Sequence, residues 1–135
     1  MHGTELRSEI HEMKISHLLW LLTGFTSVVL PGLVHAQDIS VGRAAYAQCA
    51  ACHSVNGSNG LGPTLKGVVG REAGQLPGFR FSRAMKNAGI TWDSRVLDAY
   101  LAAPQKVVPG NLMPFSGIND EQQRADIIAY LVTLK

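Results

Sequence analysis

The sequence has few cysteines and no concentration of charge. Two cysteines in 135 residues exclude a disulfide-dense scaffold. Charged residues make up 16% of the chain and the formal net charge is +2, so we expect no nucleic-acid partner. No phosphate-binding glycine loop, Ser-His-Asp arrangement or paired-carboxylate pattern is recognisable. With 46% hydrophobic residues, the chain is expected to fold as one domain around a packed core.

A hydrophobic run long enough to span a membrane is also missing. The most apolar stretch, Leu18–Leu30, is shorter than the roughly 20 residues that a span requires. Lys14 precedes it and Val34-His35-Ala36 follows it, as is typical of a secretory signal peptide with a small-residue cleavage site. We therefore predict an N-terminal extension and cleaved signal peptide over residues 1–36, a folded domain over residues 37–135, a periplasmic location, and no stable membrane insertion after cleavage. A retained anchor and a core helix are the alternatives.

Hydrophobic spacing and capping residues predict an all-α domain. The predicted helices are Ile39–Ala51, Ser82–Ala88, Ser94–Ala102 and Asp120–Leu134. The expected N-caps are Ser40, Ser82, Asp93 and Asn119, with Gln122 at a capping-box position and Pro104 closing the third helix. Between the first two helices, seven of the 14 glycines fall in residues 57–78. A loop of this length needs a reason, such as a bulky group around which it wraps.

The most informative motif is Cys49-Ala50-Ala51-Cys52-His53. The C-x-x-C-H spacing is typical of covalent c-type haem attachment, in which two thiols add to the haem vinyl groups. The following imidazole then becomes the proximal ligand, and its other nitrogen is expected to donate to a backbone carbonyl. A zinc site is disfavoured because the other four histidines precede residue 37, which leaves too few Cys and His ligands. A redox-active thiol pair and a plain disulfide are the remaining alternatives.

A haem held by one histidine needs a sixth iron ligand, and Met113 is the candidate. It lies in the segment Pro109–Phe115, where two prolines and a glycine prevent a helix and stiffen the chain. Met85 lies in a predicted short helix and is expected to fill the core, which is also the alternative for Met113. Ligation by His and Met raises the reduction potential and favours electron transfer over oxygen chemistry.

From Gly42 to the C-terminus, the chain resembles the soluble class I cytochromes c, especially mitochondrial cytochrome c and its bacterial relatives. Beyond the motif at 49–53, the shared pieces are Gly62-Pro63-Thr64-Leu65, Gly70-Arg71, Pro77-Gly78-Phe79, Gly89-Ile90-Thr91-Trp92, Tyr100-Leu101, Pro104, Pro109-Gly110, Met113, Phe115 and Arg124–Leu131. The resemblance implies the cytochrome c fold, about four helices wrapped around one covalently bound haem c.

The resemblance also implies a set of haem-binding residues. They are Cys49, Cys52, His53, Pro63, Arg71, Trp92, Tyr100, Met113 and Phe115. Among them, His53 and Met113 would ligate the iron. Pro63 would support His53 through its carbonyl, and Tyr100 would donate its hydroxyl proton to the sulfur of Met113.

Further roles and departures follow from the same resemblance. Arg71 would counter the charge of the haem propionates, Trp92 would donate to one of them, and Phe115 would cover the haem edge. Phe81 stands where the family often has a propionate-bonding tyrosine, and Met85 stands where a polar asparagine is common.

The resemblance implies a function as well as a site. We expect a non-enzymatic, monomeric, one-electron carrier that shuttles electrons between respiratory or photosynthetic redox proteins. Its partner would be a membrane cytochrome complex, an oxidase, a reductase or a dehydrogenase. A haem peroxidase or a haem subunit of an oxidoreductase complex is the alternative, and a haem-based sensor is a third. Gly42 and Tyr46 on the first helix are expected to pack against Tyr130 on the last.

Overall fold

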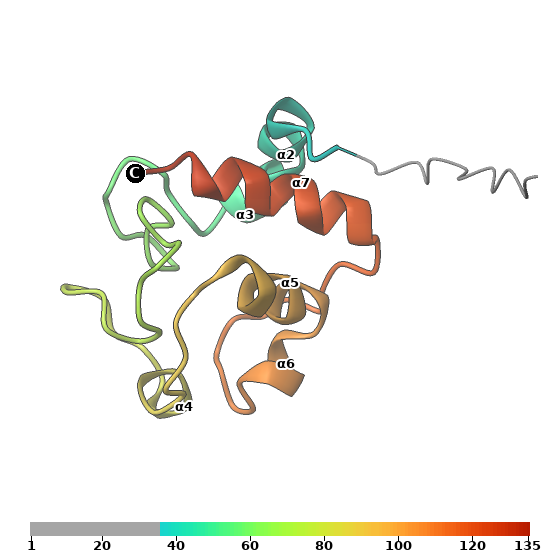
Figure 1. The fold of residues 1–135 in the computed structure, drawn as a ribbon. Helices are drawn as coiled ribbons and strands as arrows, with labels where there is room; N and C mark the ends of the chain where they lie inside the picture. Colours follow the sequence, from blue (N-terminus) through green and yellow to red (C-terminus); the bar gives the residue numbers. More distant parts are fainter. Residues whose placement is uncertain (1–35) are drawn as a thin grey trace, which may run out of the picture. The chain divides into compact units, whose positions relative to one another are not determined.

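The computed structural model describes residues 36–135, which fold into short helices joined by long loops (Figure 1). The helices are Ile39–Ala45 (α2), Ala47–Ala50 (α3), Arg83–Lys86 (α4), Ser94–Ala102 (α5), Pro104–Val107 (α6) and Glu121–Val132 (α7). The one β-type contact in this part of the chain is an isolated bridge between Glu72 and Thr91. The all-α prediction is therefore confirmed. The predicted signal peptide lies outside the described residues, and the boundary at residue 37 stays a prediction.

Two helix starts were predicted correctly from the sequence. The Ser82 hydroxyl accepts a hydrogen bond from the backbone N–H of Met85 at 3.0 Å and begins α4. The Asp93 carboxylate accepts from the N–H of Val96 at 2.7 Å and begins α5. Both side chains satisfy donors that the first turn of a helix leaves without a partner.

The other two N-cap predictions were wrong. Asp38, not Ser40, caps α2, and its carboxylate accepts from the N–H groups of Ser40 and Val41 at 2.8 and 3.2 Å. Asp120, not Asn119, caps α7 and accepts from Gln123 at 2.8 Å. In both places a carboxylate one or two residues from the predicted cap takes the position, because a negative charge also gains from the positive end of the helix dipole.

Two helix boundaries also differ from the sequence-based prediction. The expected first helix is divided, since α2 ends at Ala45 and α3 begins at Ala47 with Tyr46 between them. Pro104 does more than close α5, because it is the first residue of α6. Ala103 separates the two helices with a non-helical backbone (φ −154°, ψ 78°), and the α region is disfavoured for a residue that precedes a proline.

Helix α7 crosses α2 closely and also packs against α5, as Figure 1 shows. Gly42 makes the crossing possible, because a Cβ atom there would collide with the backbone carbonyl of Asp126. Beside this point the rings of Tyr46 and Tyr130 meet edge to face, with centroids 5.4 Å apart. The expected packing of Gly42 and Tyr46 against the last helix is therefore confirmed.

No helix within residues 36–135 is both long and apolar enough to cross a bilayer.

Candidate haem-binding site

A cavity of about 570 Å³ lies between the end of α3, the glycine-rich loop, α4, α5 and the segment after α6. Its wall includes every residue that the resemblance assigned to haem binding. These are Cys49, Cys52, His53, Pro63, Arg71, Trp92, Tyr100, Met113 and Phe115. Residues from positions 49 to 115 thus meet around one space, which is the arrangement that a wrapped prosthetic group requires.

The last turn of α3 presents the C-x-x-C-H motif to this cavity. Cys49 lies within α3 and Cys52 just beyond its end, and both thiols are free. The N–H of His53 donates to the carbonyl of Cys49 at 2.9 Å, so the helical turn continues through the motif. Burial raises the pKa of the Cys49 thiol. One turn of backbone therefore brings two thiols and an imidazole to the same wall.

The imidazole of His53 has one nitrogen already engaged. Its Nδ1 lies 2.7 Å from the carbonyl oxygen of Pro63, the contact that the resemblance implied. A carbonyl only accepts, so Nδ1 carries the proton and Nε2 is left with a lone pair for a metal. The ring also packs on Gly62, where a Cβ atom would lie 2.5 Å from Cε1 of His53. The hydroxyl of Tyr46 donates to the backbone carbonyl of His53 at 2.5 Å.

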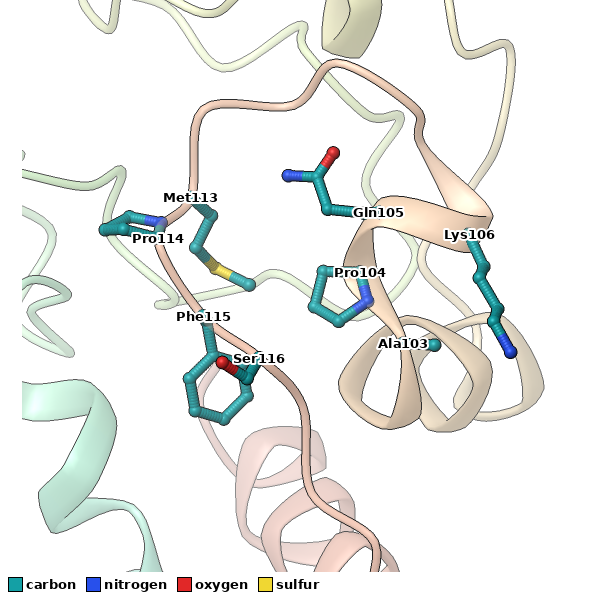
Figure 2. A pocket seen from close by; sticks show the side chains of 8 residues that line it. All are labelled: Ala103, Pro104, Gln105, Lys106, Met113, Pro114, Phe115 and Ser116. Atoms are coloured by element: carbon teal, nitrogen blue, oxygen red, sulfur yellow. The ribbon is translucent and has the colours of Figure 1, made fainter.

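Met113 reaches the cavity from a loop without helix, as predicted. Figure 2 shows its side chain extending toward Pro104 across a second pocket of about 480 Å³, which Phe115 also lines. The backbone N–H of Met113 donates to the side-chain oxygen of Asn111 at 2.9 Å. Met113 therefore lines both spaces and is held through its main chain.

The expected hydrogen bond from Tyr100 to the sulfur of Met113 is not present among the described residues. Both side chains line the cavity, but a thioether sulfur is a weak acceptor, so a hydrogen bond to it would stabilise the Tyr100 hydroxyl only slightly. The ring of Tyr100 instead meets Trp92 edge to face, with centroids 4.9 Å apart. Burial raises the pKa of Tyr100 to about 12, so its hydroxyl stays protonated at neutral pH.

Three charged residues line the cavity, Arg71, Glu72 and Arg80, and Arg71 is the one bound to backbone carbonyls of the glycine-rich loop. Its guanidinium donates to the carbonyls of Thr64 and Lys66 at 2.9 and 3.2 Å and forms no ion pair with any described residue. Burial lowers its pKa, because the charged form loses water. A partly buried cation held by carbonyls alone is suited to an acidic group bound in the cavity.

Apolar side chains make up much of the remaining wall. The rings of Phe79 and Phe81 meet at 4.8 Å, and Met85 lies nearby on α4. Leu61 and Leu112 also line the cavity, yet they are 85% and 80% exposed. The two departures from the family pattern, Phe81 and Met85, therefore make the wall more apolar.

Asn111 supports the loop that carries Met113, and its role was not predicted from the sequence. Asn111 is only 4% exposed, and its amide donates to the carbonyls of Pro104 and Val108 at 3.1 and 3.0 Å. The available signal was an asparagine directly after Pro-Gly, which is typical of a turn. Nothing in the sequence, however, shows that this turn is buried.

The donor set fits a covalently attached haem. Two thiols, an imidazole with a free nitrogen, a thioether and a partly buried cation share one largely apolar cavity. Residues 36–135 contain no group of three or more His, Cys, Asp or Glu side chains placed to hold a metal ion by themselves. The spacing of Cys49, Cys52 and His53 on one wall of the cavity matches attachment of a porphyrin through the chain's own sulfurs.

Comparison with known proteins agrees with this geometry, since residues 39–135 match the family described as cytochrome c. The chain belongs to the cytochrome c family. Like the bacterial-type class I members, this cytochrome carries covalent haem c and transfers electrons.

Several relatives are similar over nearly the whole described region. The chain is 48% identical over 100 residues to cytochrome c2 of Rhodomicrobium vannielii, and the aligned region covers 73% of this chain and 80% of that protein. It is 46% identical over 102 residues to cytochrome c2 of Rhodoblastus acidophilus, with 74% and 95% covered. The solved structure of cytochrome cH from Methylobacterium extorquens matches with a TM-score of 0.69 at 52% identity, covering 71% of this chain and 98% of that one.

Proposed function

We propose that this cytochrome is a periplasmic one-electron carrier whose haem iron is ligated by His53 and Met113. The observation that carries the proposal is the cavity itself. It holds His53 with Nε2 free, because Nδ1 is engaged by Pro63, and it also holds a methionine from a proline-stiffened loop. When bound, the haem supplies reversible exchange of one electron between ferrous and ferric iron. Because both axial positions would be filled, substrate binding at the iron is disfavoured.

The chain's own residues attach, orient and shield the group. Cys49 and Cys52 hold it through thioether bonds, and the carbonyl of Pro63 fixes the orientation of the His53 imidazole. Arg71 offsets propionate charge from its place on the cavity wall. The apolar lining excludes water, so electron transfer requires little solvent rearrangement.

The cavity rim supports contact with a redox protein partner. Leu61 and Leu112 expose most of their side chains beside the cavity, although large apolar groups usually avoid water. A membrane cytochrome complex, an oxidase, a reductase or a dehydrogenase that covers them would approach the haem at its nearest edge. The carrier would act as a monomer and leave each partner after transfer.

An absorption spectrum combined with mass spectrometry tests the proposal. The intact protein should weigh one haem more than its polypeptide, and the ferric form should show the weak charge-transfer band of thioether ligation. Carbon monoxide and peroxide should bind slowly or not at all. Rapid binding of either to the native protein would favour the peroxidase alternative and remove Met113 as a ligand.

The predicted location has its own test. In a Gram-negative host that attaches haem c, the coloured protein should be released with the periplasmic fraction, and its N-terminal sequence should begin at Gln37. Recovery of the uncut chain in the membrane fraction would support the retained-anchor alternative.

A further inference from the structure

We infer that Asn111 is a positioning residue that sets how firmly Met113 holds the haem iron. The inference rests on the proposed ligation by Met113. Asn111 does not line the cavity and would not contact the iron. It acts through its hydrogen bond to the main chain of Met113.

Asn111 connects Met113 to the turn that follows α6. Its side-chain oxygen accepts the N–H of Met113 at 2.9 Å, while its amide group donates to the carbonyls of Pro104 and Val108 at 3.1 and 3.0 Å. Its own N–H donates to Val108 at 3.1 Å. One buried side chain thus uses both ends of its amide, with the acceptor facing the ligand and the donor facing the helix.

Gln105 reinforces the same turn from α6. Its amide nitrogen donates to the carbonyl of Asn111 at 3.0 Å, and its side-chain oxygen accepts from the N–H of Gly110 at 3.2 Å. Asn111 is therefore fixed on its backbone as well as its side chain.

No other contact gives Met113 comparable support. Within the described residues, its carbonyl accepts only from Phe115, which belongs to the same loop. Its neighbours Leu112 and Pro114 are exposed, and Asn111 is the one buried residue in the segment 109–115. Asn111 is therefore the residue that joins the main-chain N–H of Met113 to the turn after α6.

The consequence concerns ligand exchange at the iron. An external ligand such as imidazole binds only when the thioether has left, so its affinity measures how strongly the loop holds Met113. Loss of the asparagine side chain removes the bond to Met113 and one of the two hydrogen bonds that each of the carbonyls of Pro104 and Val108 accepts. Both effects favour the detached loop over the attached one.

The test compares imidazole binding to the ferric holoprotein in three variants. Asn111→Ala should bind imidazole about tenfold more tightly than the wild type, which corresponds to the loss of one to two buried hydrogen bonds. Asn111→Ser keeps a hydroxyl that can accept from a backbone N–H two residues on, more weakly than the amide. The imidazole affinity of Asn111→Ser should therefore lie between those of the wild type and Asn111→Ala.

The third variant, Asp120→Ala, controls for general destabilisation. It removes the N-cap of α7, which should lower the free energy of unfolding by about 1 kcal/mol without touching the segment 109–115. If Asn111 had a merely structural role, its variants would lose stability as Asp120→Ala does, with imidazole affinity unchanged. That result would overturn the inference.

The outcome for the ligand and the outcome for Asn111 can be separated. A wild-type protein without the thioether charge-transfer band would contradict the proposed ligation itself. A wild type with the band, together with Asn111 variants of unchanged imidazole affinity, would contradict only the role of Asn111. If Asn111→Ala yields no holoprotein, Asn111→Ser decides, since an affinity within experimental error of the wild type refutes the inference.

Discussion

The two sides of the haem cavity are built differently. On one side His53 is fixed by its backbone turn, by the Tyr46 hydroxyl, by the Pro63 carbonyl and by contact with Gly62. On the other side, the N–H of Met113 donates to the Asn111 side chain, and the turn that holds Asn111 supports Met113 indirectly. The histidine is thus held by several direct contacts, whereas the methionine is held mainly through one neighbouring residue.

If His53 and Met113 ligate the iron as proposed, this difference gives them separate tasks. The histidine side must be rigid, because it also carries the covalent attachment at Cys49 and Cys52. The methionine side would tune the iron, since a thioether ligand raises the reduction potential. We therefore expect damage to the first side to prevent the holoprotein from forming, and damage to the second to leave a coloured protein with altered chemistry.

The largest effect is expected for His53→Ala. Without the imidazole, the attached haem would lack its proximal ligand, so little stable holoprotein should accumulate, as measured by haem absorbance per milligram of protein. Pro63→Ala is the matched control, because the carbonyl that His53 contacts is part of the backbone and remains. An abundant, folded and coloured His53→Ala protein would contradict the proximal assignment.

Met113→Ala should separate the two sides most clearly. Holoprotein should still form, but the iron should now bind carbon monoxide and show peroxidase-like activity, both measured on the purified variant. The physical reason is an open sixth position in a cavity that is otherwise unchanged. An unaltered spectrum with unaltered ligand binding would show that Met113 is not the ligand.

Gly42→Val tests the helix crossing behind the histidine side. A side chain at this position collides with the backbone of α7, so the free energy of unfolding should fall by about 3 kcal/mol or more. Ala44→Val, on an exposed position of the same helix, should cost only about 0.5 kcal/mol. Denaturant unfolding of both variants measures the difference, and equal losses would mean that α2 and α7 can separate without penalty.

The smallest effect concerns the pH dependence contributed by Tyr100. Burial raises its pKa to about 12 in the folded protein, whereas an exposed tyrosine has a pKa of about 10. The unfolded chain therefore loses this proton first, and the free energy of unfolding should fall as pH rises from about 10 to 12. Tyr100→Phe should show a shallower fall over that interval and the same behaviour below it. Identical slopes would show that Tyr100 is not buried from solvent.

The sequence predicted which residues line the cavity better than it predicted the contacts that support the loop around Met113. The motif at 49–53 carries its own spacing, and the stiff segment around Met113 is visible from its prolines. The starts of α4 and α5 were also predictable, because Ser82 and Asp93 directly precede helix-forming stretches.

The features that were missed depend on small differences between neighbouring residues and on burial, neither of which a local pattern reveals. The break at Tyr46 cannot be read locally, since the residues on both sides favour a helix. The caps at Asp38 and Asp120 compete with neighbouring residues of similar propensity. The role of Asn111 depends on burial, which arises only once α6 and the loop after it pack together.

The crossing of α2 and α7 has a consequence for the order of events during synthesis. The carboxylate of Asp126 accepts the N–H of Asp38 at 2.8 Å across 88 residues of chain, and Gly42 meets the backbone of the same aspartate. The segment that carries the attachment cysteines is thus made before the helix that backs it. A ribosome that stops before residue 126 releases a polypeptide whose cysteines are present but whose supporting wall is missing.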